Sequence, residues 1–234
     1  MAIGTQLSTL VDMLRAEIGA SIDRAQGVNH LPALKQTLSR TQERLWFDFD
    51  WPFAYIERDE PLQNGQRYYT FDNDIDFNRI VTAHMNYAQI WRGLEYGITP
   101  GEYNQSNPEL GMKQDPIRRW RHWEGNQFEV WPVPSSSTTR IRFRAIKRLD
   151  PLVQESDRAE LDDQLIVLYA AVELLQRAKS EDAASKKAVA DQLYARLKGL
   201  GIKQQVFTLG GGLPNDREWN LRGARILPSE RTGR

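Results

Sequence analysis

Two groups of closely spaced acids are the residues of this sequence that could do catalytic chemistry. They are Glu57, Asp59 and Glu60, and Asp72, Asp74 and Asp76. Glycoside hydrolysis uses two carboxyl groups held about 5 to 10 Å apart, and the fold sets that separation. Acids in solvated turns or on edge strands are more common than such pairs. A sugar-cleaving site therefore stays an alternative, and no catalytic residue is assigned.

The other residue types argue against further catalytic or cofactor chemistry. The chain has no cysteine, which excludes disulfides, thiolate zinc sites, iron–sulfur clusters and a cysteine nucleophile. His30, His84 and His122 stand in three separate segments, which does not predict a metal site. The glycines at 210–212 precede Leu-Pro-Asn, so they resemble a flexible joint more than a phosphate loop. We expect no enzyme activity, no metal and no cofactor.

Basic residues are concentrated between positions 118 and 148, where eight of them accompany only two acids, Glu124 and Glu129. The eight are Arg118, Arg119, Arg121, Arg140, Arg142, Arg144, Lys147 and Arg148. Clustered arginines suit a surface that faces nucleic-acid phosphates. The whole chain, however, balances 31 basic with 31 acidic residues. That balance favours a sheet face whose arginines pair with acids across a subunit contact.

Helical periodicity occurs on both sides of a central region. Apolar residues recur at spacings of three and four over 5–18, 31–45, 157–179 and 182–197. The second of these segments is expected to end near Trp51-Pro52, because proline disfavours helix in the residue before it. No apolar run reaches the roughly 20 residues that a membrane span needs, and no secretory signal is visible. We expect a soluble protein without a membrane partner.

The region from 54 to 149 changes to strand periodicity, with short aromatic and β-branched runs between turn residues. The predicted strands are Tyr55–Arg58, Gln66–Phe71, Arg79–Asn86, Gln89–Leu94, Arg118–Glu124, Gln127–Pro132 and Thr139–Lys147. Tight turns are expected at 63–65 and 124–126, and a short helix at 99–107. The alternation over 140–145 places the arginines on one face of a strand and the apolar residues on the other.

The last segment, 202–234, has no periodicity and carries three glycines in a row. Its apolar residues are too many for a solvated linker, and its basic residues outnumber its acids. Such a segment cannot bury its own apolar surface, and sequences of this kind become ordered on binding. It is therefore predicted to be an arm that docks on a partner.

Seven segments, taken in order, resemble one protein family. They are LVDMLRAEIG at 10–19, RTQERLWFDFDWPF at 40–53, LQNGQRYYTF at 62–71, LEYGITPGEYN at 94–104, DPIRRW at 115–120, GNQFEVWPVP at 125–134 and LDDQLIVLYAAVELL at 161–175. With them the chain resembles the head-to-tail adaptor, or connector, proteins of tailed bacteriophages, including those of short-tailed phages and the similar tail tubular proteins. None of the segments is a catalytic signature.

The resemblance implies an α+β fold. A helical bundle built from the two ends of the chain, 1–53 and 150–201, would carry an inserted antiparallel β-rich domain at 54–149 and an extended C-terminal docking arm at 202–234. It also implies a ring, typically of twelve copies, bound beneath the portal protein of the filled head. The ring would extend the DNA channel and offer a platform to a downstream tail or nozzle protein. The expected location is the virion, and the host cytoplasm during assembly.

The resemblance also assigns roles to residues. The portal-docking arm would use Phe207, Gly210, Gly211, Gly212, Arg217, Trp219, Arg222, Arg225, Ile226 and Leu227. Arg140, Arg142 and Arg144 would either line the channel, past which genomic DNA moves without sequence-specific binding, or join neighbouring subunits. Two other functions stay open: a peptidoglycan hydrolase associated with the virion, and a general DNA-binding module.

Overall fold

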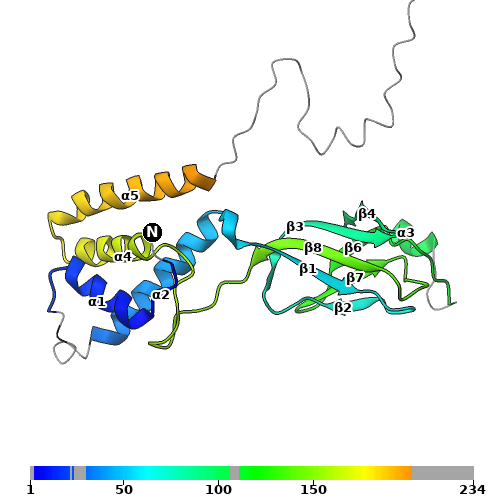
Figure 1. The fold of residues 1–234 in the computed structure, drawn as a ribbon, viewed down its shortest axis with the longest axis horizontal. Helices are drawn as coiled ribbons and strands as arrows, with labels where there is room; N and C mark the ends of the chain where they lie inside the picture. Colours follow the sequence, from blue (N-terminus) through cyan, green and yellow to red (C-terminus); the bar gives the residue numbers. More distant parts are fainter. Residues whose placement is uncertain (1–2, 22, 24–29, 106–110, 202–234) are drawn as a thin grey trace, which may run out of the picture. The chain divides into compact units, whose positions relative to one another are not determined.

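The computed structural model describes residues 3–21, 23, 30–105 and 111–201. Met1–Gly201 forms one compact unit. Within it, helices precede and follow a β-rich part along the chain, as the change in periodicity predicts (Figure 1). The fold is α+β, as expected. The segment 202–234 lies outside the described residues.

Four helices form the helical part: α1 (Leu7–Glu17), α2 (Leu31–Asp48), α4 (Asp163–Arg177) and α5 (Asp182–Gly201). Helix α4 contacts each of the other three, which explains why apolar residues extend round more than one of its sides. Leu10, Leu38 and Leu165 are among the fully buried residues of the shared core. No helix in the described segments is long and apolar enough to cross a lipid bilayer.

The sequence predicts a helix that starts at Asp157, and this boundary was wrong. Asp157 closes a turn instead, because its carboxylate accepts the N–H groups of Val153 and Gln154 at 2.8 and 2.6 Å. The following residues bridge to the N-terminal segment at Ile3 and Gln6. Helix α4 begins after Asp162, whose side chain caps it by accepting the N–H of Leu165. No pattern in the sequence around Asp157 predicts these bridges to the N-terminal segment.

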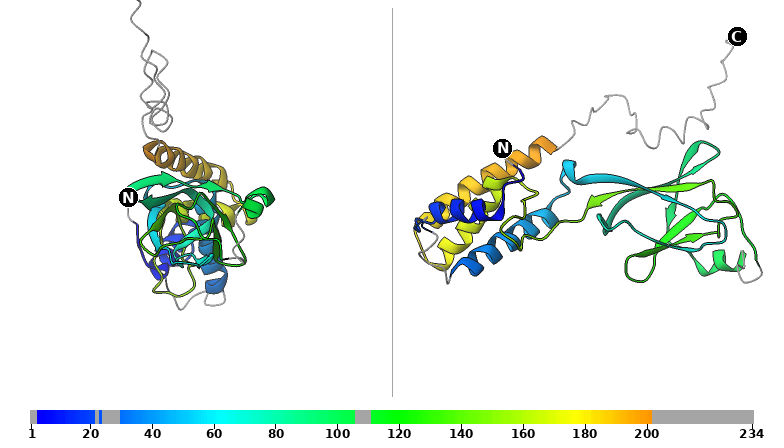
Figure 2. Two further views of the ribbon diagram at one scale, coloured as in Figure 1. Left: turned by 90° about the vertical axis from the view of Figure 1, so that its right-hand side faces the viewer. Right: turned by 60° about the horizontal axis from the view of Figure 1, so that its bottom comes forward.

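Two four-stranded sheets make up the β-rich part (Figures 1 and 2). The first sheet has the order β1-β8-β3-β4, and the second has the order β2-β7-β6-β5. The strands are β1 (Tyr55–Pro61), β2 (Tyr68–Thr70), β3 (Ile75–Tyr87), β4 (Ile90–Gly93), β5 (Glu95–Tyr96), β6 (Arg119–His122), β7 (Gln127–Trp131) and β8 (Arg140–Lys147). Phe71, Phe128 and Phe143 pack edge to face or tilted in the core of this part. The seven predicted strands are confirmed with shifted ends, and the two-residue β5 was missed.

Two of the tight turns have the conformation that their residue types predict, and a third was not predicted. Gly65 and Gly125 have positive φ, at 81° and 60°, as expected for the turns at 63–65 and 124–126. The predicted short helix is α3 (Pro100–Gln105). The turn between β3 and β4 uses Ala88 and Gln89, both with positive φ. These residue types carry no hairpin signature, so this turn has no clear signal in the sequence.

Polar contacts join the β-rich part to the helical part. Arg79 lies in an irregular stretch of β3, and its guanidinium donates hydrogen bonds to the carbonyl oxygens of Trp46 and Phe49 at 3.1 and 3.2 Å. It also forms an ion pair with Asp50. These acceptors lie at and just beyond the end of α2, where carbonyl groups have no partner within the helix. Arg79 thus anchors β3 to α2.

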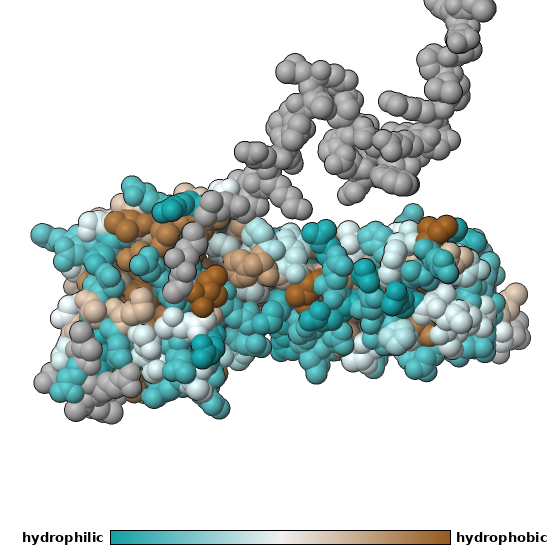
Figure 3. Space-filling model, in the orientation of Figure 1, coloured by the Kyte–Doolittle hydropathy of each residue, from teal (hydrophilic) through white to brown (hydrophobic). Residues whose placement is uncertain are grey.

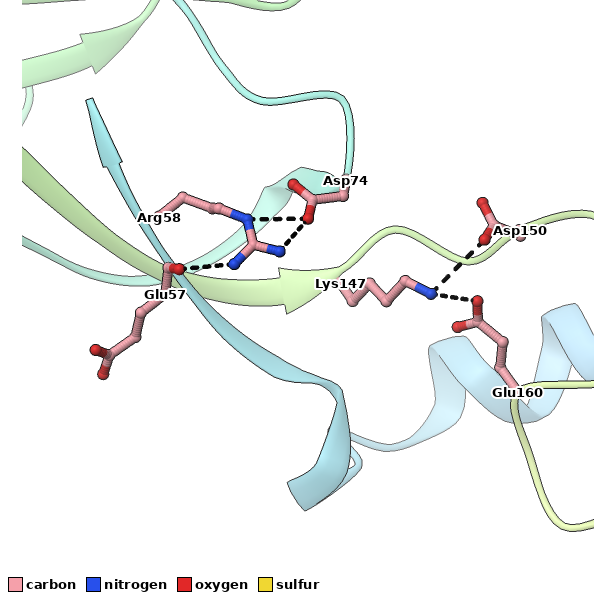
Figure 4. A network of polar contacts seen from close by, with 6 residues as sticks. All are labelled: Glu57, Arg58, Asp74, Lys147, Asp150 and Glu160. Carbon is pink, nitrogen blue, oxygen red and sulfur yellow. Dashed lines mark hydrogen bonds and ion pairs between the residues drawn. The ribbon is translucent and has the colours of Figure 1, made fainter. Parts of the chain in front are cut away.

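The second connection, between β8 and α4, has its own polar contacts (Figure 4). The Lys147 ammonium lies 2.5 Å from Glu160 and 3.6 Å from Asp150. Next along the chain, the Arg148 N–H donates to the carbonyl of Asp74 at 2.7 Å, and the side chain of Asp74 pairs with Arg58. The chain leaving the sheet is therefore tied to both parts.

Arg79→Ala is expected to lower the free energy of unfolding by about 1 to 3 kcal/mol. The Arg79 side chain is only 15% exposed, and its loss leaves helix-end carbonyls without their donor. Urea denaturation measures the change. Arg92→Ala, at an exposed position on β4, is the matched control and should change stability by less than about 0.5 kcal/mol. Equal effects of the two substitutions would contradict the anchoring role.

Candidate interaction surfaces

The three strand arginines share the outer face of the first sheet, as the alternation predicts. Along β8 the residues between them, Ile141 and Phe143, are buried against the second sheet. Arg140, Arg142 and Arg144 alternate with these and are exposed or half-buried. We call this surface the arginine face; it also includes the outward residues of β1 and β4 that contact the arginines.

The acids that balance the arginine face come from the same chain. Arg142 donates to both carboxylate oxygens of Asp59, at 2.6 and 2.8 Å, and lies 3.7 Å from Glu57. Arg140 lies 3.6 Å from Asp59. The register of β1 against β8 sets Asp59 opposite Arg142 and Glu57 opposite Arg144. Hydrogen bonding from Arg142 lowers the pKa of Asp59, so this carboxyl group stays ionised as a counter-ion.

Aromatic rings cover the same arginines. The Trp91 ring of β4 has the Arg142 guanidinium 4.4 Å and the Arg140 guanidinium 5.5 Å from its centre. Arg144 lies 5.1 Å from the centre of the Tyr55 ring. Paired and stacked arginines have fewer donors left for phosphate groups. Exposed tryptophan, tyrosine and arginine are the residue types that dominate protein–protein contacts.

The predicted basic cluster is divided between the two sheets. Arg119 and Arg121 lie on β6 of the second sheet, whereas the arginines at 140, 142 and 144 lie on β8 of the first. Arg119 forms ion pairs with Glu95 and Glu102. A stretch of sequence that is rich in arginine therefore does not make one basic surface. The acids that pair with Arg119, Arg121, Arg140 and Arg142 come from β1, β5, β7 and α3.

Glu129 is a central buried charge, although in the sequence it is only one of the two acids within the basic stretch 118–148. It is 0% exposed, and it lies 2.5 Å from Arg67 and 2.6 Å from Arg121. The Tyr103 hydroxyl, from α3, contacts both carboxylate oxygens at 2.9 Å. Burial and the neighbouring Glu129 raise the pKa of Tyr103, which keeps its hydroxyl protonated as a donor. The network fastens α3 over the outer face of the second sheet.

The acids of the sugar-cleaving alternative are divided between the two sides of β1, the turn before β3 and the start of β3. Glu57 and Asp59 lie on the arginine face, whereas Glu60 alternates to the other side of β1. Burial, with a smaller effect of Asp72, raises the pKa of Glu60. Asp74 is held by Arg58, and the carboxylate of Asp76 accepts the N–H of Asn78 at 3.1 Å. Most of these acids serve as local counter-ions or turn acceptors.

Several predicted site residues lie outside the described part of the chain. These are the residues of the docking arm: Phe207, Gly210, Gly211, Gly212, Arg217, Trp219, Arg222, Arg225, Ile226 and Leu227. Among the described residues, no group of three or more histidines and acids could hold a metal ion. His122 stacks on Phe77 with ring centres 4.9 Å apart, and His30 lies at the start of α2.

Glu129→Gln is expected to lower the free energy of unfolding by about 2 to 4 kcal/mol. The substitution removes the charge that compensates two arginines in a largely buried network. Urea denaturation measures the loss. Tyr103→Phe removes only one hydroxyl from the same site and should cost about 1 kcal/mol. An unchanged urea midpoint for Glu129→Gln would show that the network does not stabilise the fold.

Arg142→Gln is expected to raise the pKa of Asp59 toward its ordinary value. A depressed carboxyl pKa adds stability above the pKa of the unfolded chain, and that stability is lost as pH falls through the lower, folded pKa. The variant should therefore be less stable than the native chain near pH 7 and equal to it in strong acid. Carboxyl NMR titration measures the pKa. Arg144→Gln should leave the pKa of Asp59 unchanged. An equal rise in that variant would contradict the assignment of Arg142 as the residue that lowers this pKa.

Comparison with known proteins gives one family. The model of the SU10 adaptor protein family matches residues 5–213, which include all the helices and strands described above. No curated protein matches the chain. Because the match covers most of the 234 residues and agrees with the seven segments that suggested a phage adaptor, the chain belongs to the SU10 adaptor protein family of bacteriophage adaptors.

Proposed function

We propose that this adaptor forms a closed ring beneath the portal protein of the filled head and joins it to the tail. The observation that carries the proposal is the family match over residues 5–213, because an adaptor acts between the portal and tail parts of the particle. The ring would hold about twelve copies, extend the DNA channel and offer a platform to a tail or nozzle protein. Its action is mechanical and electrostatic, without a catalytic step.

The arginine face is proposed to be a contact between neighbouring subunits. A ring of identical chains needs two different surfaces that meet head to tail and close. Ion pairs within the chain offset the charges of Arg140 and Arg142, and stacking holds Arg142 and Trp91 in place before binding. Both properties reduce the cost of association with another protein surface. They are less suited to holding DNA, which gains most from unpaired cations.

The segment 202–234 is proposed to be the portal-docking arm, following a bundle of 1–53 and 150–201 that carries the insertion 54–149. Trp219, Ile226 and Leu227 would be its apolar anchors, and its arginines would meet acids of the portal. Burying apolar surface contributes about 25 cal/mol per Å², from which the cost of ordering the arm is subtracted. A joint made this way depends on a few large side chains.

The location follows from this role. The adaptor would reside in the virion at the junction of head and tail, after assembly in the host cytoplasm. Genomic DNA would pass through the ring without sequence-specific contacts. The local counter-ion roles of Glu57 and Asp59 support this structural function over a peptidoglycan hydrolase.

Full-length chain with Trp219, Ile226 and Leu227 changed to Ala is expected to bind portal rings at least about tenfold more weakly, since three apolar anchors are lost. Size-exclusion chromatography with purified portal measures binding, and native mass spectrometry of the native complex gives the copy number. Arg196→Ala, on α5 outside the arm, is the control and should bind normally. Undiminished binding by the triple variant would refute the arm assignment.

A further inference from the structure

We propose that α5 is a lever that turns away from the bundle when the portal protein binds the segment 202–234, while α1, α2 and α4 stay packed. This inference rests on the portal-docking role proposed above and adds a movement to it. Helix α5 (Asp182–Gly201) is the last described element, and the segment 202–234 follows it directly in the chain. The helix lies on the outside of the bundle (Figures 1 and 2). A force on the segment 202–234 therefore reaches the bundle through α5.

Helix α5 buries few side chains. Among residues 182–199, for which burial is described, only Ala183 and Ala190 are buried, whereas seven of the fifteen residues of α4 are buried. The larger apolar side chains Leu193 and Leu197 contact the core but stay partly exposed. Elements with few buried apolar contacts open locally at a smaller free-energy cost than the whole domain. We therefore expect α5 to open before the rest of the bundle.

A cavity of about 340 Å³ lies between α5 and the two helices α2 and α4. Its lining includes Lys187 and Tyr194 of α5, Arg44 of α2 and Gln176 of α4. Close-packed interiors have few voids larger than a water molecule, so α5 does not pack tightly on this side. In Figure 3 brown, apolar side chains reach the surface of the helical part beside α5. The contact between α5 and the bundle is therefore incomplete.

Polar contacts in the C-terminal half of α5 hold it against α2. The Tyr194 hydroxyl donates a hydrogen bond to the Asp48 carboxylate, which also lies 3.1 Å from the Lys198 ammonium. We call these three residues the latch. Hydrogen bonds from Tyr194 and then from Lys198 lower the pKa of Asp48, so its carboxylate stays ionised. The latch thus supplies polar contacts where apolar contacts are few.

The position of Asp48 is unfavourable for its own helix. Asp48 is the last residue of α2, and the C-terminal end of a helix dipole disfavours a negative charge. Its side chain is 56% exposed, and ion pairs as exposed as this contribute little each. Two further polar contacts, of Asp191 with Tyr169 and of Lys186 with Glu17, join α5 to α4 and α1 and are also partly exposed. Opening α5 therefore breaks several weak contacts rather than an extended core.

The turn at 179–181 provides the hinge. Helix α4 is closed without α5, because the N–H groups of Lys179 and Ser180 donate to carbonyl groups of its last turn at 3.1 and 3.0 Å. Lys179 has a positive φ of 54°, which a non-glycine residue rarely adopts. Movement beyond Ser180 therefore leaves these hydrogen bonds in place. Hinges absorb a rotation in a few residues at the end of an element.

Hydrogen exchange of the free full-length chain tests the movement. Amides at 186–198 in α5 should exchange together, and at least about tenfold faster than those at 167–177 in α4. Asp48→Asn removes the charge of the latch and is expected to speed the exchange of α5 by a further factor of about five, with no change in α4. Equal exchange rates in the two helices of the native chain would overturn the proposal.

Glu173→Gln is the matched control for the latch. Glu173 lines the same cavity, but its carboxylate pairs with Arg40 of α2 and Arg177 of α4. Its loss should leave the exchange of α5 relative to α4 unchanged. An equal effect of Glu173→Gln and Asp48→Asn on α5 would show that Asp48 is not a latch.

A cross-link tests whether docking needs the movement. The chain has no cysteine, so a short bismaleimide joins only two introduced thiols. Arg44→Cys together with Lys187→Cys allows α5 to be tied to α2 across the cavity. The cross-linked chain is expected to bind purified portal rings at least about tenfold more weakly, because it cannot reach the open state. Size-exclusion chromatography measures the binding.

Arg44→Cys together with Gln176→Cys is the control, because the same reagent then joins α2 to α4 from the same cavity and leaves α5 free. This chain, and both variants before cross-linking, should bind portal normally. Normal binding by the chain that is cross-linked between positions 44 and 187 would overturn the lever, while the adaptor role stands. If the native chain itself does not bind portal, the proposed docking role fails, and the lever fails with it.

Discussion

The antiparallel pairing of β1 with β8 is the constraint on which the rest of the structure depends. It joins residues 55–61 to residues 140–147, so the first and last strands of the β-rich part lie side by side. Both passages of the chain into the helical part therefore leave from neighbouring strands. Ile146 of β8 is buried in the core of the helical part, while Phe143 is buried between the sheets. One strand thus contributes to both cores.

The same pairing decides what the arginines of β8 do. Opposite residues of antiparallel strands share a face, so the register sets acids of β1 beside arginines of β8. The proposed ring needs surfaces that bind proteins firmly while DNA passes nearby. Arginines that are already paired and stacked lose little freedom on binding a protein, and they attract phosphate less than free ones do. Local charge balance is therefore compatible with the proposed function.

Much of the fold could be predicted from the sequence because its signals are periodic. The alternation over 140–145 predicted that Arg140, Arg142 and Arg144 share one face. The spacing of apolar residues by three and four predicted the helices. Some features could not be predicted, because they depend on contacts between distant segments of the chain. The start of α4 depends on contacts with the N-terminal segment, and β5 is two residues long and pairs in parallel with β6. The positive φ of Ala88 and Gln89 is imposed by the hairpin, against the preference of those residues.

The sequence by itself determined the order of helices and strands, the outward arginines of β8 and, through its seven segments, the adaptor family. These properties depend on residue type and on spacing along the chain. The tertiary structure alone decided which acid meets which arginine, that the basic stretch is divided between two sheets, that Glu129 is buried and that Asp48 contacts α5. Each depends on which distant segments pair, because strand pairing and burial are set by contacts that chain spacing does not encode.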